Sequence, residues 1–197
     1  LNLYHFAGKW LMVDLGITFG DDTTPGIEVL VPDPSYIEAQ KENLLGIFIT
    51  HGHEDHIGAI PYLCERLNCP IYATPFTMSL IRRKLSDVNL LDKIELIEVP
   101  LSNKIELGPF IVEFVSLTHS IPDPSGILIK CDDYSVFHTG DWKFDENPQI
   151  GEATDFSKLE EFSLKGVTAM IADSTNVDLH KKTGSEAELL EPLNDLC

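Results

Sequence analysis

The run His-Gly-His-Glu-Asp-His at positions 51–56 places three imidazoles and two carboxylates within six residues. The apolar stretch directly before it is typical of a buried strand, whose end delivers His51 and His53 from one loop. Both can then reach the same ion, because neutral imidazole binds zinc and other divalent transition metals. Asp55 and His56 point elsewhere as the loop turns into a helix, and they suit a second ion. A single histidine in a polar loop is more often incidental than a metal ligand, but three at this spacing are rarely incidental. The motif therefore predicts a dinuclear metal site.

Two further polar clusters follow strand-like runs. His119 comes shortly after the alternating run 110–117, and Asp141 shortly after the run 134–137. Asp141 is the natural bridge, because its two oxygens can bind two cations and lessen their mutual repulsion. His119 would complete the ligands of the first ion. His138 is a further candidate ligand, but it lies three residues before Asp141 in an extended segment, so we expect it to face another way.

Asp14 follows the apolar run 10–13 and precedes a turn at Gly16. A carboxylate at this strand end can accept the spare N–H of a metal-binding histidine and so fix its tautomer and orientation. We therefore predict that Asp14 accepts a hydrogen bond from a metal-binding histidine and does not itself bind the ion. A solvated turn aspartate explains the local sequence nearly as well.

The composition bounds the class of protein. A chain of 197 residues suits one domain, and we expect residues 1–197 to contain no internal boundary. There is no basic N-terminal region followed by an apolar run, and no apolar stretch approaches the roughly 18 residues of a membrane span. The cysteines lack CxxC spacing, which indicates neither a disulfide framework nor a thiolate zinc site. These features predict a cytoplasmic protein with no membrane partner.

The net charge argues against binding of nucleic acid, because 14 basic and 32 acidic residues give a net charge of −18. Proteins that bind a phosphate backbone usually carry basic clusters. The one local basic group, 82–84, lies on an expected amphipathic helix and is typical of a solvated face. Part of the acidity belongs to the metal ligands, and bound divalent ions would reverse the local sign there.

Hydrophobic periodicity predicts an alternation of strands and helices. The expected strands are 3–6 and 9–13 as a hairpin, then 45–49, 71–73, 94–99, 104–107, 110–117, 126–131, 134–137 and 167–172. The expected helices are 34–42, 57–67, 77–85, 156–164 and 185–196. Residues 21–34 form the longest irregular loop, which either borders the active site or is an ordinary surface excursion.

Asp14, the 51–56 motif, His119 and Asp141 resemble, in order and spacing, the successive motifs of the metallo-β-lactamase superfamily. The longer stretches 47–63, 118–123, 138–145 and 172–176 resemble the ribonuclease J family of β-CASP nucleases. This resemblance covers almost the whole chain. It implies an α/β fold, the metallo-β-lactamase αββα sandwich, present here in part.

The resemblance implies a metal-dependent ribonuclease with 5′-to-3′ exonuclease and endonuclease activity in RNA processing and decay. The implied substrate is single-stranded, 5′-monophosphorylated RNA, and the implied assembly is a dimer or tetramer. Two divalent ions would serve as cofactors, with zinc as the first candidate and manganese as the second. Sequence does not distinguish them, because the mixture of histidines and carboxylates fits either.

The mechanism needs two cations about 3.5–4 Å apart, which activate a water and stabilise the charge of the transition state. The expected ligands are His51, His53 and His119 for one ion, Asp55 and His56 for the other, and Asp141 for both. Asp55 can also accept a proton from the nucleophile, so Asp55 and Asp141 are the expected catalytic residues.

The chain begins at Leu1 without a methionine and ends within a helical pattern, which indicates a fragment. By resemblance, the remainder would contain a β-CASP domain, the last histidine ligand of the second ion and the groups that bind the 5′ phosphate. We therefore expect residues 1–197 alone to be inactive. Two other functions stay open: hydrolysis of a small ester, thioester or lactam by the same metals, and non-catalytic binding of RNA or a partner protein.

Overall fold

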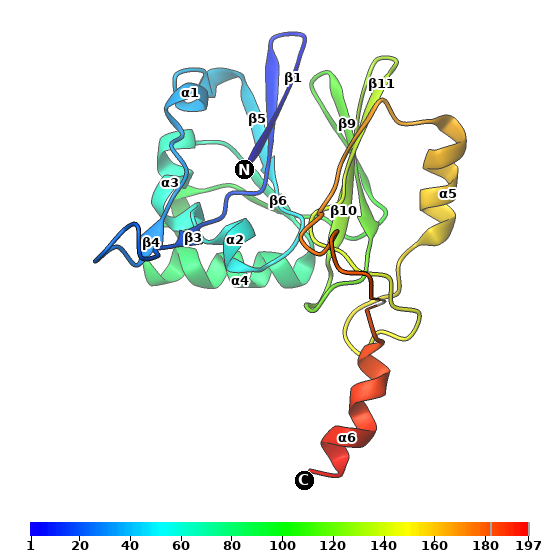
Figure 1. Ribbon diagram of the computed structural model, residues 1–197. Helices are drawn as coiled ribbons and strands as arrows, with labels where there is room; N and C mark the ends of the chain where they lie inside the picture. Colours follow the sequence, from blue (N-terminus) through cyan, green and yellow to red (C-terminus); the bar gives the residue numbers. More distant parts are fainter. Residues whose placement is uncertain (182, 197) are drawn as a thin grey trace.

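The computed structural model describes residues 1–181 and 183–196. Its centre is a pair of five-stranded sheets (Figure 1). The first sheet has the order β1 (Asn2–Phe6), β2 (Lys9–Val13), β5 (Leu44–Phe48), β6 (Ile71–Ala73), β7 (Leu96–Glu98). The second has the order β12 (Ala169–Ile171), β11 (Tyr134–His138), β10 (Ser125–Cys131), β9 (Phe110–Ser116), β8 (Lys104–Leu107).

Helices cover the outer face of each sheet (Figure 1). The first sheet is covered by α1 (Ser35–Glu38), α3 (Ile60–Leu67) and α4 (Pro75–Asp87), and the second by α5 (Phe156–Lys165). The four layers are therefore helix, sheet, sheet, helix. The predicted αββα sandwich is confirmed.

The alternation of side chains along β2 shows how the sequence builds these layers. Leu11 and Val13 belong to the core between the two sheets, which also contains Phe48 and Phe114. Met12 points the other way, into the core beneath α3 and α4. Successive residues of a strand face opposite sides of its sheet. A strand in this position must therefore be apolar on both faces, as the sequence of β2 is.

Strand direction decides where the loops gather. In the first sheet β2, β5, β6 and β7 run parallel, so their carboxyl ends lie at one edge. In the second sheet β9 and β11 are both antiparallel to β10 and thus run in the same direction as each other. The loops after β2 and β5 therefore share one edge of their sheet, and those after β9 and β11 share one edge of theirs.

The expected helix 57–67 is divided in the structure. A short helix α2 (Glu54–Ile57) precedes α3, and the two are separated at Gly58 and Ala59. The N–H of Ala59 donates to the carbonyl oxygen of Leu15 at 3.0 Å instead of continuing the helix. Pro61, which has no N–H to donate, then stands in the first turn of α3, where a proline is tolerated.

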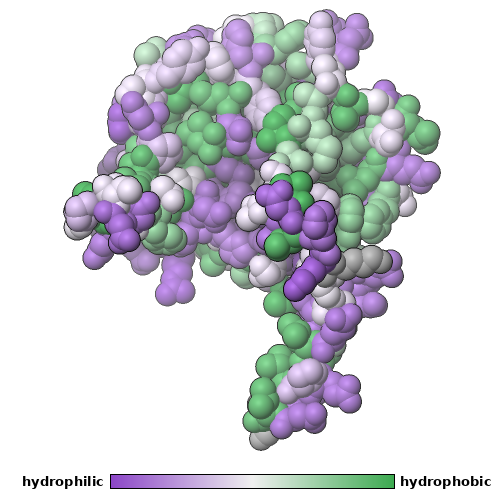
Figure 2. Space-filling model, in the orientation of Figure 1, coloured by the Kyte–Doolittle hydropathy of each residue, from purple (hydrophilic) through white to green (hydrophobic). Residues whose placement is uncertain are grey.

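Two other expected helices are partly 3₁₀. Residues 34–42 contain α1 followed by the 3₁₀ turn η1 (Lys41–Asn43). Residues 185–196 contain η3 (Glu186–Leu189) followed by α6 (Leu190–Asn194), which projects from the sandwich (Figure 1). Hydrophobic side chains lie along this projection (Figure 2), and the half-exposed or more exposed ones are Leu189, Leu190, Leu193 and Leu196.

The segment 21–34 is less irregular than expected. Its residues Val29–Leu30 form β4, which pairs with β3 (Thr18–Phe19) in a small antiparallel sheet. The other predicted strands and helices lie within a few residues of their expected bounds. The 3₁₀ turn η2 (Leu91–Lys93) before β7 was not predicted. Among the described residues no helix is long and apolar enough to cross a bilayer. The absence of an internal domain boundary stays a prediction.

Candidate metal centre

The loops after four strands bring the predicted site residues together. Asp14 directly follows β2, and the 51–56 motif follows β5. His119 follows β9, and Asp141 follows β11. Each sheet thus supplies two loops to a site between the edges of the two sheets, where residues far apart in the chain, such as Asp14 and Asp141, become neighbours.

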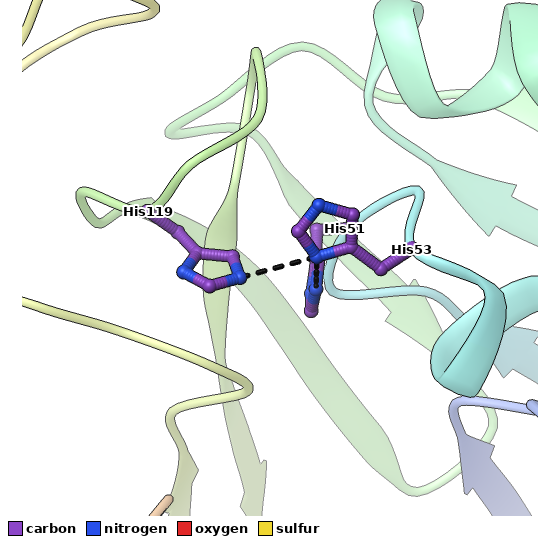
Figure 3. Close-up of side chains that lie close together, drawn as sticks. All are labelled: His51, His53 and His119. Carbon is purple, nitrogen blue, oxygen red and sulfur yellow. Dashed lines mark hydrogen bonds between the residues drawn. The ribbon is translucent and has the colours of Figure 1, made fainter. Parts of the chain in front are cut away.

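Three histidines form the first cluster, which we define as His51, His53 and His119 (Figure 3). Nδ1 of His53 lies 3.0 Å from Nε2 of His51 and 3.1 Å from Nε2 of His119. A tetrahedral zinc ion with bonds of about 2.0–2.1 Å would hold its ligand nitrogens about 3.3 Å apart. The three ring nitrogens converge at nearly that spacing, so this donor set fits one divalent ion.

The second cluster consists of His51, His56 and Asp141, whose donor atoms lie within 4.8 Å of one another. Oδ1 of Asp141 is 3.4 Å from Nε2 of His56, and Oδ2 of Asp141 is 3.8 Å from Nε2 of His119. The two carboxylate oxygens of Asp141 thus face one cluster each. This is the geometry that a carboxylate shared by two cations requires.

Asp55 lies at the margin of the second cluster. Its Oδ2 is 3.5 Å from Nε2 of His56, but its side chain is 62% exposed and belongs to neither cluster. His51, which the sequence assigns to the first ion, takes a place in both clusters instead. The role of Asp55 as a ligand of the second ion and as a proton acceptor stays a prediction.

Asp14 is buried behind His56 and holds it. Its Oδ2 accepts a hydrogen bond from Nδ1 of His56 at 2.8 Å, which leaves Nε2 of that ring facing the second cluster. Its Oδ1 accepts the backbone N–H of Thr50 at 2.8 Å. The backbone of Asp14 has a left-handed φ of 60°, a conformation that aspartate tolerates better than most residues and that is common where a site imposes it.

The backbone of residues 15–17 packs closely against α2 and holds it beside this site. The N–H groups of Leu15 and Ile17 donate to the carbonyl oxygens of His56 and Glu54 at 2.8 and 3.1 Å. Gly16 lies between them, and a Cβ at this position would stand only 1.6 Å from the carbonyl oxygen of Asp55. Glycine is therefore required here, because any side chain would push α2 away from the strand end.

Burial and charge set the protonation states of the clusters. Burial, followed by the charge of His56, lowers the pKa of His51 to about 3, and burial also lowers the pKa of His119. Burial alone would lower the pKa of His56 as well, but hydrogen bonds to Asp14 and Asp141 raise it to about 10. The hydrogen bond from His56 in turn lowers the pKa of Asp141 to about 2. An ion that binds His56 must displace its proton, which links metal binding to pH.

The sequence analysis assigns no role to two residues that lie at the site, Thr50 and Tyr4. Thr50 is fully buried, and its hydroxyl donates to Oδ2 of Asp14 at 3.0 Å. Tyr4 lies far away in the sequence, yet its hydroxyl is 2.7 Å from Nδ1 of His138. His138 belongs to neither cluster; its Nδ1 faces the hydroxyl of Tyr4, while its ring lines the same pocket as Asp14, His56 and Asp141. Thr50 precedes the histidine motif directly, whereas nothing in the local sequence marks Tyr4.

Comparisons with known proteins agree with this geometry. A family model described as the metallo-beta-lactamase superfamily matches residues 3–176. Ribonuclease J of Sinorhizobium meliloti is 39% identical over 197 residues, covering 98% of this chain and 35% of that protein. Ribonuclease J of Corynebacterium glutamicum is 39% identical over 197 residues, covering 100% of this chain and 27% of that protein. This chain thus spans about a third of the length of these curated relatives.

Solved structures share the fold at low sequence identity. Zn(2+)-bound PqqB from Methylobacterium extorquens has a TM-score of 0.58 and 16% identity, covering 92% of this chain and 64% of that chain. A protein of unknown function from Enterococcus faecalis V583 has a TM-score of 0.64 and 17% identity, covering 98% of this chain and 53% of that chain. The resemblance to ribonuclease J that the motifs indicated is confirmed. By its family model, its layers and its histidine motif, the chain belongs to the metallo-beta-lactamase superfamily.

Proposed function

We propose that a protein containing this chain hydrolyses RNA phosphodiesters with a pair of divalent metal ions. The observation that carries the proposal is the similarity to ribonuclease J over nearly the whole chain, at 39% identity, together with two clusters of three side chains that could each hold a metal ion. A phosphodiester suits such a site, because its oxygens can approach one or both ions. The negative net charge is compatible with this substrate, since two divalent ions would make the site itself positive.

The residues have distinct roles in the proposed reaction. His51, His53 and His119 would hold one ion, Asp55 and His56 the other, and Asp141 both. The ions, when bound, lower the pKa of a water and stabilise the charge that develops on the phosphate. Asp14 keeps Nε2 of His56 turned toward the site. We assign to Asp55, whose exposed carboxylate lies 3.5 Å from Nε2 of His56, the role of accepting the proton of the attacking water.

The finer assignments rest on the ribonuclease J relatives. We propose 5′-to-3′ exonuclease and endonuclease activity on single-stranded, 5′-monophosphorylated RNA, with zinc as the first candidate metal and manganese as the second. A β-CASP domain elsewhere in the protein, assembly into dimers or tetramers and a cytoplasmic location belong to the same proposal. For residues 1–197 alone we expect no RNA cleavage.

The test uses a protein of the relatives' length that contains this chain, loaded with zinc or manganese. We expect it to degrade 5′-monophosphorylated single-stranded RNA, and we expect His53→Ala to abolish turnover while the fold persists. His180→Ala, which changes an exposed histidine outside both clusters, is the matched control. Intact RNA together with turnover of a cephalosporin or lactoylglutathione reporter would favour the small-molecule hydrolase instead.

A further inference from the structure

A hydrogen bond joins the two sheets beside the candidate metal centre. Tyr4 lies on β1 of the first sheet, and His138 ends β11 of the second. The hydroxyl of Tyr4 is 2.7 Å from Nδ1 of His138, and the two rings pack edge to face with centroids 6.2 Å apart. His138 is only 4% exposed. Its ring is therefore held in one place, and its other nitrogen has a defined direction.

That other nitrogen faces the carboxylate that supports the metal ligand. Nε2 of His138 lies 3.9 Å from Oδ2 of Asp14, the same oxygen that accepts the hydrogen bond from His56 at 2.8 Å. A continuous series of contacts thus leads from Tyr4 through His138 and Asp14 to His56. Nothing in this series requires a residue of the first cluster.

The charge of Asp14 selects one tautomer of His138. Burial lowers the pKa of His138, so its ring is neutral and carries one N–H. If the hydrogen stood on Nδ1, the lone pair of Nε2 would face the Asp14 carboxylate, which is unfavourable. With the hydrogen on Nε2, a positive N–H dipole faces Asp14, and Nδ1 is free to accept the phenolic O–H of Tyr4. Both contacts are then favourable.

We propose that Tyr4 is a positioning residue of the metal centre, which acts through His138 to orient Asp14 and, through Asp14, the imidazole of His56. Partners behind a metal-bound histidine fix its tautomer and ring orientation and raise its affinity for the ion. Nε2 of His138 stands 3.9 Å from Oδ2 of Asp14, beyond hydrogen-bond distance, so His138 acts on this oxygen through the direction of its N–H dipole. The reversed tautomer would turn a lone pair toward the oxygen that holds His56. The inference rests on the proposed function only in that His56 binds an ion.

The first test measures metal affinity in Tyr4→Phe, which removes one oxygen and keeps the ring. Competition titration with a chromophoric zinc chelator should show about tenfold weaker binding of the ion at the second cluster, with the first cluster unchanged. Tyr62→Phe is the matched control, because Tyr62 is 61% exposed on α3. Equal affinities in Tyr4→Phe and the wild type, or no ion bound by wild-type His56, would overturn the inference.

A second pair of variants separates positioning from simple packing. In His138→Gln the side-chain amide N–H₂ can turn a positive dipole toward Asp14, whereas in His138→Leu no N–H remains. We expect the glutamine variant to retain most of the affinity and the leucine variant to lose it. Equal losses in both variants would mean that the ring serves packing alone.

The ring tautomer gives a readout that needs neither metal nor RNA. A long-range proton–nitrogen correlation spectrum of the histidine rings should show His138 protonated on Nε2 in the wild type and as a mixture of tautomers in Tyr4→Phe. A wild-type ring protonated on Nδ1 would contradict the inference. These measurements contain no RNA, so a protein that fails to cleave RNA would refute the proposed function without refuting this inference. Likewise, a negative result in these measurements would refute this inference without refuting RNA cleavage.

Discussion

Oδ2 of Asp14 accepts a hydrogen bond from Nδ1 of His56 at 2.8 Å, although the two residues are 42 positions apart. Asp14 directly follows β2, and His56 lies in α2. This bond makes Nε2 the free nitrogen of His56 and turns it toward Asp141. The geometry of the second cluster therefore depends on a residue that would not itself touch an ion.

Asp14→Asn tests this dependence, since it removes the charge and keeps the shape. We expect the affinity for the ion at the second cluster to fall by about 10–100-fold, while the affinity of the first cluster stays unchanged. Competition titration with a zinc chelator measures both. Asp22→Asn in the exposed turn after β3 is the control. An unchanged second affinity would show that His56 needs no support from Asp14.

Metal removal should lower stability, because an ion that binds only the folded state stabilises it. At a free zinc concentration of one hundred times Kd, the gain is about 2.7 kcal/mol per site. Calorimetry with and without a chelator should therefore show a higher Tm with zinc. His53→Ala should lose the contribution of the first cluster, and His180→Ala should keep it. A Tm that zinc does not move would contradict the site.

The metal-free protein should lose stability as the pH rises above about 6.5. The pKa of His56 is raised to about 10 in the fold, with burial opposing the effect of Asp14 and Asp141. A raised pKa stabilises the fold fully below the unfolded value of about 6.5, and this stability is lost as the pH rises through the folded value. Urea unfolding in a chelator between about pH 6.5 and 8, below the titration of most thiols, follows the effect.

His51 acts in the opposite sense, because its pKa is lowered to about 3, chiefly by burial. Below about pH 6.5 the unfolded chain binds a proton that the folded chain refuses, so acidification also costs stability. Stability of the metal-free chain should thus decline on both sides of about pH 6.5. His56→Gln should flatten the alkaline decline and also weaken the acid decline in part, because the charge of His56 contributes to the lowered pKa of His51. An alkaline decline of wild-type size in that variant would refute the assignment.

Gly16→Ala tests the close approach beneath α2. The new methyl group would meet the carbonyl oxygen of Asp55 at 1.6 Å, so α2 must move. We expect a loss of about 1–3 kcal/mol in the free energy of unfolding, as for other overpacked positions, together with weaker binding at the second cluster. Gly184→Ala is the control, because its Cβ would meet only the flexible end of Glu188. Wild-type stability in Gly16→Ala would show that the strand end can relax.

The sequence predicted the sheets and the histidine cluster well, for a physical reason. Strands buried on both faces, such as β5, are apolar throughout, and their polar ends stand out. The break between α2 and α3 was missed, because it depends on the distant carbonyl group of Leu15. Tyr4 was missed for the same reason, since its partner His138 lies 134 positions away and no local pattern marks such a contact.

The most direct measurement is an anomalous difference map from a zinc-soaked crystal of this chain. We predict one peak about 2.0–2.1 Å from Nε2 of His51, Nδ1 of His53 and Nε2 of His119. We predict a second peak about 3.5–4 Å from the first, beside His56, with Asp141 between the two. Absence of a peak among the three histidines, or an Asp141 that contacts neither ion, would contradict the metal centre on which the proposed function depends.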